Sequence, residues 1–189
     1  KDVVSNEICI APSWNLNSKF LDYVEKILDN SINNFKVRFR PHKNSFRYHK
    51  KKISNLIEKY SKFENFILDL DPNSLDYVLK SKYFFSDWSG ASFEYAFSRL
   101  RPVIFFQSPL KINNPKHNEV PFQPVEIGYR ERIGLILKES DLNNLNKIYL
   151  EIDKNLSQYE NKIFKARSEL VYNVGNSAEF GKKFLDELN

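Results

Sequence analysis

The feature that most constrains the fold is an alternation of short apolar runs with amphipathic stretches. The apolar runs are almost continuous, as strands buried on both faces of a sheet require, and they cover residues 7–11, 35–40, 66–70, 83–86 and 103–106. Between them, apolar residues recur at helical spacing over about 17–30, 53–60, 74–80 and 91–99. Connections of a few residues join these segments. The pattern predicts an α/β fold, a Rossmann-like doubly wound parallel sheet with helices on both faces.

The second half of the chain is less regular. Residues 107–132 show no clear period and contain four prolines, so this connection is longer than the ~12–15 residues usual for a structureless loop. We expect it to be functional or mobile. Residues 134–137 indicate one more strand, and the remainder indicates two or three polar helices, broken near 173–176. We therefore predict a Rossmann-like domain over 1–138 and a helical C-terminal extension, 139–189, that packs on it.

Composition narrows the class of protein. With 41% hydrophobic and 15% aromatic residues, the chain can form a core, and its apolar runs are far too short to span a bilayer. It starts at Lys1 and has no methionine, so we expect a piece of a longer protein and draw nothing from the missing targeting segment. The single Cys9 lies in an apolar run and is predicted to be a buried, reduced thiol, which fits a cytoplasmic setting.

The chain is basic, with a net charge of +5 and its densest cluster at 49–52. A solvated helix face is the simplest interpretation; the alternatives are a surface for nucleic acid, an anionic membrane or a phosphorylated substrate. No zinc finger, RNA-recognition signature or homeodomain helix is present, so we expect no nucleic-acid partner. No Walker loop, nucleophile elbow or metal-ligand spacing is present either, and we expect no metal and no cofactor.

Polar turns follow the predicted strands. The carboxyl ends of parallel strands meet at one edge of a sheet, where doubly wound folds bind their ligands. Four turns are expected at this edge: residues 12–14, 40–42, 71–73 and 86–92.

The last of these turns runs directly into a predicted helix, whose first N–H groups lack intrahelical partners and attract anions. Gly90 would let a phosphate approach the backbone at Ala91, and Ser89 and Ser92 could donate hydroxyls. The alternative is a tight connection in which one serine caps the helix. Glu94, in the first helical turn, could complement the helix dipole or accept hydrogen bonds from the two hydroxyls of a ribose.

Other polar side chains near these turns have more than one interpretation. Asp87 could cap the helix, bridge to a backbone N–H or orient a ligand group. Arg40 and His42, at the end of the second strand, could neutralise a diphosphate, and a protonated His42 could assist a departing phosphate. An ordinary surface histidine is the alternative. His49 and His117 lack such neighbours and are predicted to be surface residues.

Taken together, these stretches resemble the CDP-glycerol glycerophosphotransferase (teichoic-acid polymerase-like) family. The similarity covers about residues 7–137 and rests on ICIAPSW, VRFRPH, FILDL and YFFSDWSGASFEYAFSRLRPVIFF, which occur in the order and spacing of that family. Two positions depart from its pattern. Gly90 stands where a second serine is usual, and Lys43 stands where a proline often follows the histidine.

The resemblance implies the C-terminal, donor-binding half of a glycosyltransferase of the two-Rossmann-domain type. It implies that His42, as the catalytic residue, and the Ser89 turn contact the donor diphosphate, and that Glu94 contacts the ribose. It further implies a base site bordered by Pro12, Ser13, Trp14 and Asp71. The general base would lie in the other half, so this chain alone should bind the donor without turnover.

Three hypotheses of function follow. The first is a transferase that moves a polyol phosphate from CDP-glycerol or a similar donor to a lipid-linked or surface-polymer acceptor, such as teichoic acid or capsule. The family's acceptors imply a cytoplasmic enzyme, peripheral on the inner face of the cell membrane. The second is a glycosyltransferase that uses a UDP- or CMP-activated sugar. The third is a nucleotide-binding module without catalysis.

Overall fold

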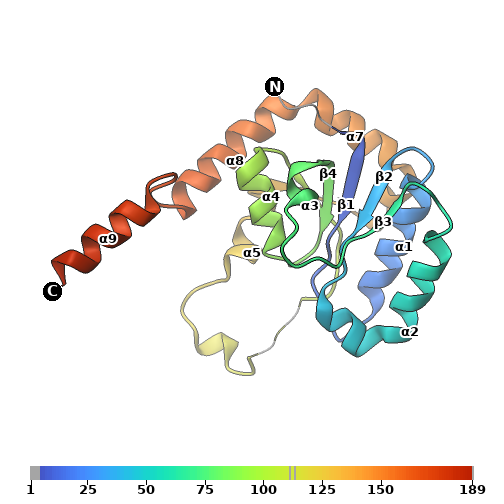
Figure 1. Cartoon of the computed structure of the whole chain (residues 1–189), viewed down its shortest axis with the longest axis horizontal. Coiled ribbons are helices and arrows are strands. Elements are labelled where there is room, and N and C mark those ends of the chain that lie inside the picture. The colour runs from blue at the N-terminus through green and yellow to red at the C-terminus, as the bar shows by residue number, and fades with distance from the viewer. Residues whose placement is uncertain (1–4, 111, 113, 189) are drawn as a thin grey trace.

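The computed structural model describes residues 5–110, 112 and 114–188 (Figure 1). Within these residues, six parallel strands form one sheet in the order β3-β2-β1-β4-β5-β6. They are β1 (Glu7–Ile10), β2 (Lys36–Phe39), β3 (Phe66–Leu68), β4 (Ser81–Ser86), β5 (Val103–Phe105) and β6 (Gly134–Ile136). The order reverses between β1 and β4, which makes this a doubly wound sheet and confirms the predicted Rossmann-like α/β fold.

Helices cover both faces of the sheet (Figure 1). The first face packs against α1 (Lys19–Ser31), α2 (Lys43–Tyr60) and α7 (Leu145–Lys154). The second packs against α3 (Asp76–Leu79), α4 (Ala91–Arg99), α6 (Arg130–Ile133) and α8 (Leu156–Leu170). The remaining elements are α5 (Val125–Gly128), α9 (Ser177–Glu187) and the 3-10 turns η1 (His117–Glu119) and η2 (Glu139–Asn144).

Successive strand residues enter two separate cores. Ile8 and Ile10 of β1 and Phe85 of β4 join the first core, whereas Cys9 and Phe84 join the second, and all five are fully buried. Successive residues of β1 and β4 are therefore buried on opposite faces of the sheet, which is why these strands appear in the sequence as nearly continuous apolar runs. Cys9 is a buried free thiol, as predicted, and its burial raises the pKa of that thiol.

One helix begins earlier than predicted. α2 begins at Lys43, well before its first fully buried apolar residue, Ile53. Its first turns are polar and are capped by His42, so apolar spacing does not reveal them. In the segment 107–132, where the sequence shows no clear period, the described residues form η1, α5 and the start of α6. Each of these elements has only three or four residues, which is too few to show a period.

Glycine at position 134 is required by the pairing of β6 with β5. Gly134 lies in register with Val103, and a Cβ built on Gly134 would come within 2.0 Å of the Val103 carbonyl oxygen. Its φ of −177° is ordinary extended backbone, so close approach of the neighbouring strand, and not conformation, demands a glycine here.

The C-terminal helices do not all pack on the sheet. α7 and α8 contribute buried residues to the two cores, whereas α9 buries none of its residues and projects away from the domain (Figure 1). Among the C-terminal helices, α7 and α8 thus pack on the sheet, whereas α9 does not. Among the described helices, none is long and apolar enough to cross a membrane.

Candidate functional site

A cleft of about 840 Å³ opens at the carboxyl ends of β1 to β4, on both sides of the point where the strand order reverses. Each of the four loops that leave these strands contributes to its wall. The lining residues that carry the argument are Pro12, Arg40, His42, Lys43, Phe46, Asp69, Leu70, Leu75, Tyr77, Ser89, Ala91 and Glu94. The edge at which the sequence predicts ligand binding is thus hollow in the structure.

His42 lies in the cleft wall and caps α2. Its Nδ1 accepts a hydrogen bond of 3.1 Å from the backbone N–H of Asn44. Because Nδ1 is the acceptor, the neutral ring carries its proton on Nε2, and His42 is suited to donate a hydrogen bond from that atom. Protonation of Nδ1 would break the cap. The cap therefore fixes the orientation of the imidazole ring at the start of α2.

The aromatic ring of Trp14 supports His42 from outside the cleft. The two ring centroids are 6.5 Å apart, and Trp14 also stacks on Tyr48 at 5.2 Å with an interplanar angle of 17°. Trp14 is not part of the cleft lining. This arrangement does not support the implied contact of Trp14 with a base, because Trp14 lies beside His42 and outside the cleft lining.

Asp87 faces inward and links three loops. It is 1% exposed; one carboxylate oxygen accepts from the backbone N–H of Ser13 at 2.6 Å, and the other accepts from the Ser108 hydroxyl at 2.8 Å. These bonds join the loops that follow β1, β4 and β5. Of the three roles that the sequence left open for Asp87, the structure selects a bridge to a backbone N–H.

The second half of this turn forms the N-terminus of α4 in the cleft. Ser89 and Ala91 line the cleft, and Gly90 is exposed at the N-cap position. Gly90 has a helical φ of −57°, and a Cβ added there would meet nothing within 4 Å, so the fold itself does not demand glycine. Ser92 differs from expectation. Its hydroxyl is fully buried without a partner among the described residues, and it cannot reach a phosphate in the cleft.

Arg40 is fixed within the cleft wall. Its Nη1 donates to Asp69 Oδ1 at 2.8 Å and to the backbone carbonyl of Asp71 at 2.7 Å, and its guanidinium lies 4.5 Å from the centroid of the Tyr77 ring. Asp69 offsets its positive charge. Arg40 therefore contributes less to neutralising a diphosphate than the sequence suggested.

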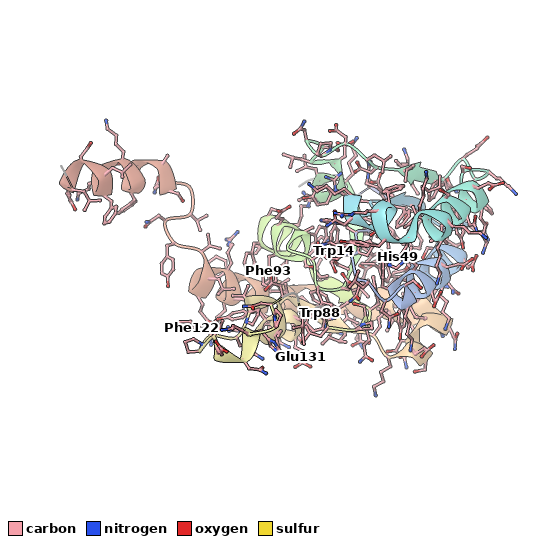
Figure 2. The ribbon with its side chains drawn as sticks, turned by 90° about the horizontal axis from the view of Figure 1, so that it is seen from below. Trp14, His49, Trp88, Phe93, Phe122 and Glu131 are labelled. Carbon is pink, nitrogen blue, oxygen red and sulfur yellow. The ribbon has the colours of Figure 1, made fainter. Side chains whose placement is uncertain are left out.

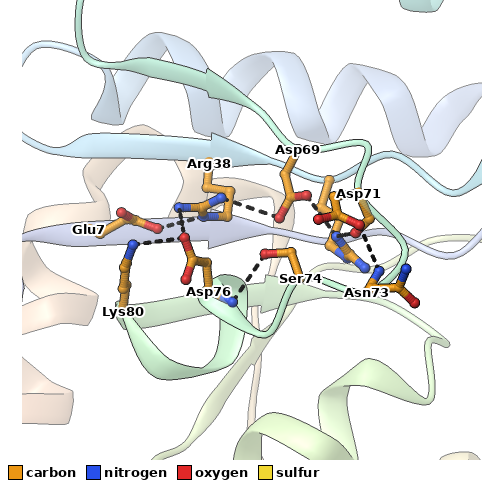
Figure 3. Close-up of polar contacts among 9 residues, drawn as sticks. Glu7, Arg38, Asp69, Asp71, Asn73, Ser74, Asp76 and Lys80 are labelled. Atoms are coloured by element: carbon orange, nitrogen blue, oxygen red, sulfur yellow. Dashed lines mark hydrogen bonds and ion pairs between the residues drawn. The ribbon is translucent and has the colours of Figure 1, made fainter.

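Behind Arg40 lies a buried ionic network (Figure 3). Arg38 bonds Glu7 at 2.6 Å and Asp69 at 3.3 Å, and these three side chains are at least nine-tenths buried. Burial alone would lower the pKa of the Arg38 guanidinium, but its bond to Glu7 and the charges of Glu7 and Asp69 raise it. Two buried carboxylates, with the partly exposed Asp76 3.7 Å from Arg38, thus balance Arg38 and Arg40, and the network holds Arg40 in place from β1 and the end of β3.

Glu94 and Tyr77 meet across the cleft wall. Glu94 is exposed on the first turn of α4, and its Oε2 accepts a hydrogen bond from the Tyr77 hydroxyl. Tyr77 is buried; this burial, and then its bond to Glu94, raises the pKa of the phenol, so Tyr77 remains a donor. The sequence analysis missed Tyr77 because a tyrosine in a four-residue helix is indistinguishable from an ordinary core aromatic.

Of the two turns implied to border a base, 12–14 and 71–73, each contributes one proline to the cleft lining, Pro12 and Pro72. Ser13 is buried, and the Asp71 carboxylate accepts the N–H of Asn73 within its own turn (Figure 3). The rest of the apolar wall is formed by Phe46, Leu70 and Leu75. Lys43, which also lines the cleft, was noticed in the sequence only as a departure from the family pattern.

The other two histidines lie apart from this cleft. His49, labelled with Trp14 in Figure 2, is half-buried, and its Nε2 lies 2.7 Å from the backbone oxygen of Asn15, so it is not the surface residue that was expected. His117 is exposed, as expected. In the part of the chain that the structure describes, no group of histidine, cysteine, aspartate and glutamate side chains is arranged to hold a metal ion.

No protein-family model and no curated protein matches the sequence. Among solved structures, the chain is similar to the wall teichoic acid polymerase TagF, in a histidine-to-asparagine variant soaked with CDPG. The TM-score is 0.54 at 20% sequence identity, over 98% of this chain and 42% of that chain. At this identity the likeness shows the fold, a Rossmann-like α/β domain. The chain spans less than half of the polymerase's length.

Proposed function

We propose that this chain is the donor-binding part of a transferase that moves glycerol phosphate, or a similar polyol phosphate, from a CDP-activated donor to a surface-polymer acceptor. The observation that carries the proposal is the convergence of His42, Ser89, Ala91 and Glu94 on one cleft at the switch point of a doubly wound sheet. Folds of this kind bind nucleotides there. The CDPG in the similar polymerase structure supports the choice of a cytidine donor.

The diphosphate would lie between the N-termini of α2 and α4, whose first residues, Lys43 and Ala91, both line the cleft. Both helix ends direct the positive end of a helix dipole at the cleft. The Asn44 N–H is already bonded to His42 Nδ1, and the Ala91 N–H is bonded to the Ser89 hydroxyl at 3.4 Å, a long bond that a phosphate would have to displace. Lys43 adds an exposed ammonium group. In the proposed reaction an acceptor hydroxyl attacks the phosphorus of the polyol phosphate and CMP leaves. A hydrogen bond from His42 to the leaving phosphate would stabilise the charge that develops on it.

The nucleoside would occupy the rest of the cleft. Glu94 presents a carboxylate that can accept from ribose hydroxyls, and Phe46, Leu70 and Leu75 form an apolar wall against which a base can pack. The position of Glu94 on the helix that carries the Ser89 turn fits a ribose attached directly to the diphosphate.

Calorimetry with CDP, UDP and ADP tests the proposal. We expect CDP to bind more tightly than the other two. Equal affinities would contradict the cytidine assignment, and a preference for UDP would favour a nucleotide-sugar glycosyltransferase.

The variant Gly90→Val tests the phosphate site separately. Its side chain would occupy the open space in front of the N-terminus of α4, so CDP binding should be lost with little change in melting temperature. Normal CDP binding by Gly90→Val would show that the turn is only a connection. The matched control is Gly181→Val in α9, which also has open space at its Cβ and is remote from the cleft.

A further inference from the structure

We infer that Tyr77 is a positioning residue that orients Glu94 toward ribose hydroxyls, so that the cleft selects ribonucleotides over 2′-deoxyribonucleotides. The inference rests on the proposed nucleotide-binding function. It adds to that function a positioning residue, Tyr77, and a preference between ribose and 2′-deoxyribose.

Glu94 needs a partner to hold it in one conformation. It is exposed on α4, and a free glutamate side chain at such a position samples several rotamers. The Tyr77 hydroxyl bonds Oε2, and this is the one side-chain hydrogen bond that Glu94 makes with the described residues. The second carboxylate oxygen, Oε1, is therefore left to accept a hydrogen bond from a ligand in the cleft that Glu94 lines.

Tyr77 is itself rigid, which lets it act as an anchor. Only 5% of the residue is exposed, and its ring packs against Phe84 at 6.1 Å between centroids. The Arg40 guanidinium lies over the same ring and is in turn bonded to Asp69. A chain of contacts thus runs from Asp69 at the end of β3, through Arg40 and Tyr77, to Glu94 on α4.

The chemistry of the pair favours a hydroxyl donor. A carboxylate with one oxygen held by a phenol can form a short, charge-assisted hydrogen bond through the other. The 2′-hydroxyl of a ribose is such a donor, and its removal would leave the carboxylate oxygen without a partner in the complex. A phosphate would be repelled by the same carboxylate. The arrangement therefore orients the nucleotide as well as selecting its sugar.

The test compares the affinities for CDP and 2′-deoxy-CDP by calorimetry. We expect the unaltered chain to prefer CDP by about tenfold, the lower end for a hydrogen bond to a charged group. Tyr77→Phe keeps the ring beneath Arg40 and removes only the hydroxyl, and it should reduce the preference to about twofold, through weaker binding of CDP. Glu94→Gln should do the same. The double variant should show no further loss, because both changes remove one coupled interaction.

The matched control is Tyr95→Phe. Tyr95 is also buried, and its hydroxyl donates to the backbone carbonyls of Ser81 and Lys82, outside the cleft. This variant also loses a buried hydroxyl, so its free energy of unfolding should fall by a similar amount. It should keep the preference of about tenfold for CDP over 2′-deoxy-CDP. The melting temperature of each variant separates lost folding from lost specificity.

The outcomes distinguish this inference from the proposed function. An unchanged preference in Tyr77→Phe, or an additive loss in the double variant, would overturn the role of Tyr77 while leaving nucleotide binding intact. Equal binding of CDP and 2′-deoxy-CDP by the unaltered chain would overturn the sugar specificity alone. Absence of binding to both ligands would overturn the proposed function and this inference with it.

Discussion

At the scale of single residues, His42 has both a structural role and a proposed role in binding phosphate. Its Nδ1 caps α2, which fixes the ring, and this bond assigns the proton of the neutral ring to Nε2. One side chain therefore contributes to helix stability and to the proposed phosphate contact. Substitutions can separate the two contributions, because other residues can supply the cap without supplying the donor.

We expect His42→Ala to lower the free energy of unfolding by about 0.5–2 kcal/mol through loss of the cap. It should also weaken CDP binding by about 10- to 150-fold, the value of one hydrogen bond to a charged group. His42→Asn should restore the cap through its side-chain oxygen but not the affinity. Urea unfolding and calorimetry measure the two effects. His117→Ala, at an exposed histidine, is the control. A loss of cytidine affinity as large as that of CDP would contradict a diphosphate contact.

The sequence predicts where the turns of this site lie, but it does not predict which way their side chains point. Ser89 and Ser92 both follow the fourth strand, yet Ser89 lines the cleft while Ser92, in the first turn of α4, is buried. The difference comes from where α4 begins, because Ser89 precedes the helix and Ser92 lies within it. Asp87 could be assigned only from the structure, since its partners Ser13 and Ser108 are distant in sequence.

At the scale of elements, apolar periodicity predicts the segments whose side chains are buried and does not reveal the segments whose side chains are exposed. The strands and α1 were predicted within one or two residues because tertiary packing requires their apolar residues. The start of α2 and the short helix α5 depend more on capping and local turns, which leave a weaker trace in the sequence. The short helix α3 was predicted within two residues, but its spacing did not distinguish Tyr77 from a core aromatic, so a residue central to the site was not identified.

Pairing of β6 with β5 depends on Gly134, and this gives a prediction at the scale of elements. Gly134→Ala would place a Cβ against the backbone of Val103, which cannot yield as a flexible side chain can. We expect the free energy of unfolding to fall by about 1–3 kcal/mol. Urea unfolding measures it. Gly128→Ala is the control, because its Cβ would meet only the Gln123 side chain at 3.8 Å and should change stability by less than about 0.5 kcal/mol. Equal effects of the two substitutions would contradict the steric argument.

At the scale of the whole molecule, the cleft is built from four loops that the sheet brings to one edge. The doubly wound order follows from the alternation of strands and helices, so the location of the site could be predicted from the sequence. The balance of charges at the site could not be predicted from the sequence. Glu7, Arg38 and Asp69 come from β1, β2 and the end of β3, and only the order of strands in the folded sheet brings them together. Apolar periodicity also predicted a C-terminal extension but not where packing on the domain ends.

In the structure, packing of the C-terminal helices on the domain ends with α8, and truncation of the chain tests this boundary. Removal of residues 172–189 takes away α9, which buries no residue, so the melting temperature should change by less than about 2 °C and CDP affinity should not change. Removal of residues 156–189 also takes away Ile163 and Ala166, both fully buried in the second core. Loss of an isoleucine alone costs about 1.5–3 kcal/mol. The longer truncation should therefore melt more than about 6 °C lower, followed by circular dichroism. A large loss of stability in the shorter truncation would show that α9 belongs to the folded domain.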